Sequence, residues 1–181
     1  MNEDPTMRRT LAASATALLM LAACGAPDSL AIGQTATYEV ADDRSGTDAK
    51  LDVAVIGVKE VTKSALGDVQ LKEDYASLYL VTYTAKVTSG KYAADYTYPF
   101  SAYKWSGDAS KGKVTTINVV MGGIDGCPGF SSETTAKLAK GEQITACQVL
   151  ATDEKGALTD VSLDSSRKGA RTQGLWWSAQ A

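Results

Sequence analysis

Apolar and polar residues alternate along much of the chain, which is the pattern of strands with one buried face. The alternation is clearest at residues 36–40, 51–58 and 79–87, which are rich in Val, Ala and Tyr. Shorter apolar runs predict further strands at residues 99–105, 113–121, 143–152, 158–163 and near 175–177. Stretches rich in Gly, Asp and Ser separate these runs and indicate turns, and helical periodicity is almost absent. The pattern therefore predicts an all-β fold, a β-sandwich of about seven to nine strands.

The start of the chain has a different pattern. Arg8 and Arg9 precede an apolar run at residues 11–23. A basic start followed by a short apolar run is typical of an export signal, and the run is too short to span a bilayer, which takes about 20 residues. Acidic residues precede the signal, so translation from Met1 and translation from Met7 both stay open.

The apolar run ends in Leu21-Ala22-Ala23-Cys24, which resembles the bacterial lipobox. The resemblance implies cleavage before Cys24, a diacylglycerol on its sulfur, and a membrane anchor on the extracytoplasmic face. Two acyl chains anchor a protein stably without a basic patch. We therefore expect a signal peptide at 1–23, a lipidated tether at 24–33 and one domain at 34–181. The alternative is an ordinary signal peptide in which Cys24 falls at this place by chance.

Composition and charge exclude several functions. The 181 residues include no histidine, which removes histidine-based general acid/base catalysis and imidazole metal sites. With 18 basic and 21 acidic residues the net charge is −3, which offers no footprint for nucleic acid. The chain thus favours binding over catalysis, and we expect no catalytic residues, no cofactor and no metal.

In an oxidising compartment, we expect the three cysteines to have two different roles. Lipid on Cys24 leaves Cys127 and Cys147 as a pair, which would pin a glycine-rich turn to a strand. The alternative is two free buried thiols.

Two stretches of the chain resemble a known family. Residues 138–150 with the polar gap at 153–156, and the opening Ile32-Gly33-Gln34 before Tyr38, resemble the telokin-like immunoglobulin domains of Gram-positive secreted proteins and lipoproteins. The resemblance covers about residues 32–164. It implies an immunoglobulin-like β-sandwich that serves as an extracellular binding module, with no catalytic residues.

Three motifs suggest chemistry but lack its other elements. Ser101 and Lys104 match Ser-x-x-Lys, as do Ser110 with Lys113 and Ser165 with Lys168, without the further motifs of penicillin-recognising enzymes. The glycine-rich residues 122–129 lack the lysine of a phosphate-binding loop, so we interpret them as a turn that could contact a partner. The aspartates of residues 42–52 lack the spacing of a calcium loop.

Aromatic residues gather at residues 92–105. Tyr and Trp give a large contact area at low entropic cost, so they are enriched in recognition surfaces. We predict a binding surface for an envelope protein or polymer at Tyr92, Tyr96, Tyr103 and Trp105, with core packing as the alternative. The expected protein is a non-catalytic, lipid-anchored binding module. A small-ligand sensor or solute-binding lipoprotein, and an envelope hydrolase using carboxylates or a Ser/Lys pair, are the alternatives.

Overall fold

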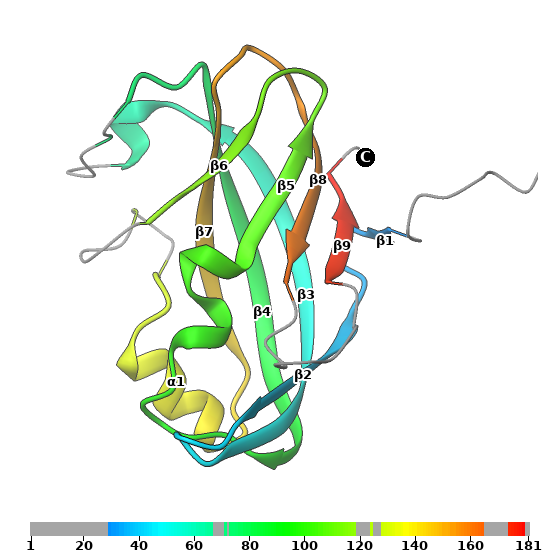
Figure 1. Cartoon of the computed structure of the whole chain (residues 1–181), viewed down its shortest axis with the longest axis vertical. Coiled ribbons are helices and arrows are strands. Elements are labelled where there is room, and N and C mark those ends of the chain that lie inside the picture. The colour runs from blue at the N-terminus through cyan, green and yellow to red at the C-terminus, as the bar shows by residue number, and fades with distance from the viewer. Residues whose placement is uncertain are drawn as a thin grey trace, which may run out of the picture.

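The computed structural model describes residues 29–66, 71, 73–118, 124, 128–164 and 174–179. Within these residues the chain is mostly β and forms two sheets (Figure 1). The predicted signal peptide, Cys24 and Cys127 lie outside the described residues, as do half of the tether and most of the glycine-rich turn. No helix of the described part is both long and apolar enough to cross a membrane.

The larger sheet has five antiparallel strands in the order β2-β3-β4-β7-β6. Their bounds are Ala36–Asp42, Thr47–Val61, Ser77–Lys91, Ile144–Thr152 and Val114–Ile117 respectively. The smaller sheet has the order β1-β9-β8-β5, with bounds Leu30–Ala31, Leu175–Ser178, Leu158–Leu163 and Trp105–Ala109. Its strands are antiparallel except for β1, which runs parallel to β9.

The main core lies between the two sheets. Val53, Tyr83 and Leu150 of the larger sheet and Leu163 and Trp177 of the smaller one are all fully buried in it. Alternation along the strands produces this core, because every second residue of a strand points to the same face. The pattern of hydrophobic residues therefore accounts for the packing of the two sheets.

A second cluster covers the opposite face of the larger sheet. On β4, Tyr79 and Val81 belong to the main core, whereas Leu78 and Leu80 belong to the second cluster. A 3₁₀ helix, η1 (Lys63–Leu66), contributes Leu66 to this cluster, with 1% of the residue exposed. Both faces of β4 are thus packed along this stretch.

The predicted strand at residues 99–105 is wrong. The chain instead forms two 3₁₀ helices, η2 (Tyr98–Phe100) and η3 (Ala102–Lys104), and β5 begins only at Trp105. Pro99 explains the difference, because proline has no N–H for a strand ladder and its fixed φ suits the first turn of a helix.

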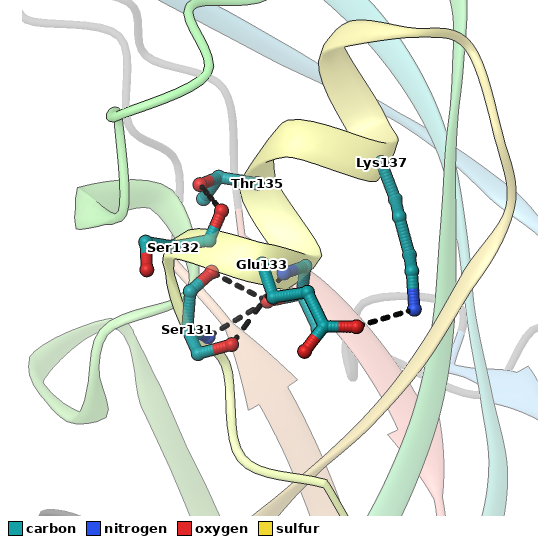
Figure 2. Close-up of polar contacts among 6 residues, drawn as sticks. Ser131, Ser132, Glu133, Thr135 and Lys137 are labelled. Atoms are coloured by element: carbon teal, nitrogen blue, oxygen red, sulfur yellow. Dashed lines mark hydrogen bonds and ion pairs between the residues drawn. The ribbon is translucent and has the colours of Figure 1, made fainter.

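One α-helix, α1 (Ser132–Ala139), interrupts a region in which no helix was expected. Ser131 caps it: its hydroxyl accepts from the Thr134 N–H, and the Thr134 hydroxyl accepts from the Ser131 N–H (Figure 2). Glu133 and Lys137 form an ion pair of 2.9 Å on its exposed side. Leu138 anchors the helix to the main core.

Candidate functional site

The four predicted binding residues do not share one surface. Tyr103 is 83% exposed and Tyr96 is half-buried, whereas Tyr92 and Trp105 are only 4% and 2% exposed. The prediction is therefore wrong for Tyr92 and Trp105. The Trp105 ring packs 4.6 Å from the ring of Tyr83 in the core, and the Tyr92 hydroxyl donates to the Tyr96 carbonyl at 2.7 Å.

Burial also changes the titration of two of these tyrosines. It raises the pKa of Tyr92 far above its ordinary range, with a smaller contribution from Tyr96. Burial and then the charge of Asp42 raise the pKa of Tyr96. Both phenols therefore remain neutral at physiological pH and act as hydrogen-bonding groups only.

Phe100 is the centre of the aromatic packing beneath this segment. Its ring stacks on that of Tyr83 with 5.4 Å between centroids, and it lies 5.9 Å from the ring of Tyr38 and 4.9 Å from that of Phe130. Phe100 thus joins the core to the loop that leads into α1.

Both ends of the segment that holds η2 and η3 are tied to the end of β8. The Tyr38 hydroxyl donates to the carbonyls of Asp164 and Pro99, at 2.7 and 3.4 Å. The Asp164 N–H donates to the Lys104 carbonyl at 2.7 Å, and the Lys104 ammonium lies 3.8 Å from the Asp164 carboxylate. These contacts hold the segment in a fixed position on the sandwich.

α1 holds the loop that precedes this segment. The Thr135 hydroxyl donates to the carbonyl of Ala94 and lies 2.9 Å from that of Ser132. Figure 1 shows α1 beside the short helices that precede β5. The segment is therefore held by Tyr38 of β2 and by Asp164 at the end of β8, and the loop before it is held by α1.

Two tyrosines of this segment project from the surface. Within the described part of the chain, the large hydrophobic residues classed as exposed are Tyr98, Tyr103 and Ile56. Tyr98 is 50% exposed, and the Lys104 ammonium lies 5.1 Å from the centre of its ring, within cation–π range. Ile56 lies elsewhere, at a bulge in β3 where the register with β4 shifts.

A small pocket opens beside Tyr103. Among the described strands, β6 pairs with β7 from Val149 to Thr152, and none of them pairs with the earlier part of β7 on that side. The pocket has a volume of about 190 Å³, and we name it the Phe100 pocket. Its lining residues are Thr97, Phe100, Ser101, Ala102, Tyr103, Asn118, Ile124, Gly129, Phe130, Cys147 and Gln148.

Two residues next to Phe100, Ser101 and Tyr83, carry buried polar atoms without a hydrogen-bond partner. Four buried side-chain polar atoms of the described residues have no hydrogen-bond partner: Tyr83 Oη, Ser101 Oγ, Trp105 Nε1 and Thr152 Oγ1. Ser101 follows Phe100 and lines the pocket, and the Tyr83 ring contacts those of Phe100 and Trp105. Such groups are rare in native proteins.

The Ser101–Lys104 motif is not arranged as a nucleophile and its base. The Lys104 side chain points to the Asp164 carboxylate and the Tyr98 ring. The Lys104 backbone N–H donates to the Ser101 carbonyl. Ser110 has a structural role, since its hydroxyl accepts from the Ala157 N–H at 3.0 Å. Ser165 and Lys168 lie outside the described residues.

Asp42 also has a structural role. Its carboxylate accepts from the Ser45 N–H at 2.8 Å, which closes the β2–β3 turn, and hydrogen bonding to Ser45 lowers the pKa of Asp42. In the described ranges no three His, Cys, Asp or Glu side chains converge as a metal site would require.

Cys147 lies on β7, as predicted for a strand residue. It is not a free thiol, and its sulfur lies 3.5 Å from the Thr82 hydroxyl oxygen. Because Cys127 lies outside the described residues, the Cys127–Cys147 pair stays a prediction.

Sequence reasoning missed Phe100 and Gln148 as wall residues of the pocket. Gln148 is 7% exposed on the inner face of β7, and its amide nitrogen donates to the Ile117 carbonyl at 2.7 Å. A polar residue among the apolar positions of β7 was the available signal. Comparison of the chain with known protein families, with curated proteins and with solved structures finds no match.

Proposed function

We propose that the protein is a lipid-anchored, extracytoplasmic binding module for a protein or polymer of the cell envelope, and that it acts without catalysis. The observation that carries the proposal is the exposed Tyr103 ring beside the Phe100 pocket. A large exposed aromatic side chain next to a pocket is typical of a recognition site. The hydrogen bonds of Tyr38 and Asp164 hold this site in position before any ligand arrives.

The membrane anchor and the immunoglobulin-like fold belong to the same proposal. The resemblance of residues 21–24 to a lipobox supports a membrane anchor, and the resemblance at residues 138–150 supports an immunoglobulin-like arrangement of the two sheets. The Cys127–Cys147 pair would fix the loop before α1 to β7. The intact mass of the membrane-extracted protein tests the anchor: diacylglycerol on Cys24 adds mass that Cys24→Ser removes. A mature protein without this added mass would refute the anchor.

Photo-crosslinking in the native envelope tests the binding function. A photoreactive amino acid replaces Tyr103 in one variant and Ile56 in another. Ile56 is the matched control, because it is an exposed large hydrophobic residue on β3, which β4 separates from β7. We expect one dominant captured protein or polymer from position 103 and none from position 56. Equal capture at both positions, or none at position 103, would contradict a binding site at Tyr103.

A small-ligand sensor is the second candidate, and the Phe100 pocket favours it. The pocket has a volume of about 190 Å³, whereas ordinary small-molecule sites have volumes of about 300 Å³ or more. This size suits one chemical group of a larger ligand better than a whole metabolite. Recognition of a polymer or a protein therefore remains the leading proposal.

A further inference from the structure

A second pocket opens between the two sheets and shares no lining residue with the Phe100 pocket. It lies between the later part of β3, the start of β4, the turn from β7 to β8, and the residue that follows β9. We name it the Glu60 pocket, after a residue of β3 that lines it. Its volume of about 400 Å³ lies within the range of ordinary small-molecule sites, about 300 to 1,000 Å³.

Backbone contacts hold the rim of the Glu60 pocket in place. The Tyr79 hydroxyl donates to the Gly156 carbonyl at 2.6 Å, which ties the turn from β7 to β8 to β4. A Cβ atom on Gly156 would lie 2.9 Å from the Lys111 backbone nitrogen, so this close approach requires glycine. The Ala179 N–H donates to the Thr159 carbonyl at 2.7 Å. The pocket is therefore formed before a ligand arrives, which lowers the entropic cost of binding.

Two opposite charges line the Glu60 pocket. They belong to Glu60 and Lys155, which are both exposed. In the described part of the chain neither residue forms an ion pair, with the other or with a third residue. A ligand with one charge would be attracted by one of these groups and repelled by the other. A ligand that carries both an ammonium and an anionic group is complementary to both.

The other walls of the pocket include apolar side chains and one hydroxyl. Leu158 belongs to the main core, and Val58 and Ala179 pack against that core. Ser77 is 6% exposed, and its hydroxyl forms no hydrogen bond in the described part of the chain and is not among the four fully buried unpartnered atoms. The pocket thus offers an apolar surface and a free hydroxyl beside its two charges. An α-amino acid with an apolar side chain has the matching groups.

We propose that the Glu60 pocket binds a free α-amino acid with an apolar side chain. Its ammonium lies at the Glu60 carboxylate, its carboxylate at the Lys155 ammonium, and its side chain against Val58 and Leu158. Glu60 and Lys155 are the residues that determine specificity. This inference goes beyond the proposed function and does not depend on Tyr103.

Isothermal titration calorimetry of the full-length protein tests the inference. The probes are leucine, valine, methionine and phenylalanine. We expect at least one of them to bind. The N-acetyl derivative of that amino acid lacks the ammonium, and its amide lacks the carboxylate. Each should bind about fivefold more weakly or less, as for one exposed ion pair lost.

Two further probes carry both charges but no apolar side chain. They are glycine and phosphoethanolamine, the soluble headgroup of a phospholipid. Both should bind more weakly than the apolar amino acid, because they leave Val58 and Leu158 in contact with water. Equal or tighter binding of phosphoethanolamine would overturn the assignment to an amino acid and indicate a lipid headgroup.

Substitution of each charged residue should affect one end of the ligand only. Glu60→Gln should weaken binding about fivefold and remove the difference between the amino acid and its N-acetyl derivative. Lys155→Met should do the same for the difference between the amino acid and its amide. A purely structural role of either residue would weaken all probes alike, and that result would overturn the proposal.

Glu142→Gln and Lys140→Met are the matched controls, because both residues are exposed and neither lines the pocket. They should leave binding unchanged. The melting temperature should be the same in all four variants, since Glu60 and Lys155 are exposed and make no ion pair. Binding that survives both Glu60→Gln and Lys155→Met would overturn the assignment to this pocket.

Residues 180 and 181 follow Ala179 and lie outside the described residues, so a variant that ends at Ala179 completes the test. It should bind the amino acid as the natural chain does. Binding that appears only in the shortened variant would overturn the proposal for the natural protein. If no amino acid binds while position 103 still captures a partner, this inference fails and the proposed function stands.

Discussion

The Tyr38 hydroxyl donates a hydrogen bond of 2.7 Å to the backbone carbonyl of Asp164, 126 residues further along the chain. This bond joins β2, the edge strand of the larger sheet, to the end of β8 in the smaller sheet. Because the same hydroxyl lies 3.4 Å from the Pro99 carbonyl, it also fixes the start of the segment that carries Tyr103. One phenol thus couples the two sheets to the candidate site.

Tyr38→Phe should destabilise the protein by about 1 kcal/mol, because it removes this hydrogen bond and leaves the ring in place. Urea unfolding monitored by circular dichroism measures the change in the free energy of unfolding. Tyr103→Phe is the control and should have no effect, since Tyr103 is exposed. Equal stability of Tyr38→Phe and the natural protein would show that the bond does not couple the sheets.

Leu138→Ala tests the docking of α1 on the core. Leu138 is fully buried, so its truncation leaves a cavity and should cost about 2–5 kcal/mol in the free energy of unfolding. Lys137→Ala, on the exposed side of the same helix, should leave stability nearly unchanged, because surface ion pairs contribute little. Denaturant unfolding compares the two variants. A similar loss in both would mean that α1 does not dock through Leu138.

Alkaline pH should unfold the protein through its buried tyrosines. Burial raises the pKa of Tyr83 and Tyr92 well above the value of about 10 that holds in the unfolded chain. The unfolded state therefore loses protons first as the pH rises. This contribution to stability is complete below about pH 10 and declines above it.

Tyrosinate absorbance and circular dichroism, followed together, check this expectation. The absorbance of the two buried phenols should rise only when the circular dichroism signal is lost. Tyr92→Phe should be less stable than the natural protein at neutral pH, because its hydrogen bond to Tyr96 is lost, and the difference should shrink above about pH 10. A constant difference at all pH values would contradict titration linked to burial.

The predicted Cys127–Cys147 disulfide has a separate test. In the chain-entropy approximation a loop of about 20 residues contributes roughly 3 kcal/mol to stability. The double variant Cys127→Ser/Cys147→Ser should lose stability of this order, and thiol titration of the unfolded, unreduced protein should find neither of the two thiols free. Two reactive thiols would refute the pair.

The sequence predicted the strands better than the segment between them. The alternation at residues 51–58 and 79–87 lies within β3 and β4, because burial of one face imposes a period of two. Residues 98–105 also carry spaced aromatic residues, but there Tyr98, Pro99 and Phe100 form a 3₁₀ helix. Pro99 was the signal against a strand.

The sequence of α1 has only a weak hydrophobic pattern. Leu138 is its only large apolar residue, so no stripe of hydrophobic residues marks a helix. The usable signals were Ser131 as N-cap, Glu133 in the first turn and Lys137 in the last.

The candidate site could be predicted only in part. Tyr103 was one of four residues predicted to form a binding surface, with core packing as the alternative, and it is 83% exposed. The pocket beside it was not predictable, because it depends on where β6 ends against β7 and on how Phe100 meets Phe130. Those contacts join residues far apart in the chain, and no local pattern encodes them.

The pairing of β1 with β9 places the two ends of the described chain side by side (Figure 1). Trp177 of β9 is fully buried, and its indole N–H donates to the Gln34 carbonyl at 3.0 Å. The smaller sheet therefore cannot be completed until the last strand has been synthesised. Until β9 is in place, Trp177 is missing from the main core and the Gln34 carbonyl lacks this hydrogen bond.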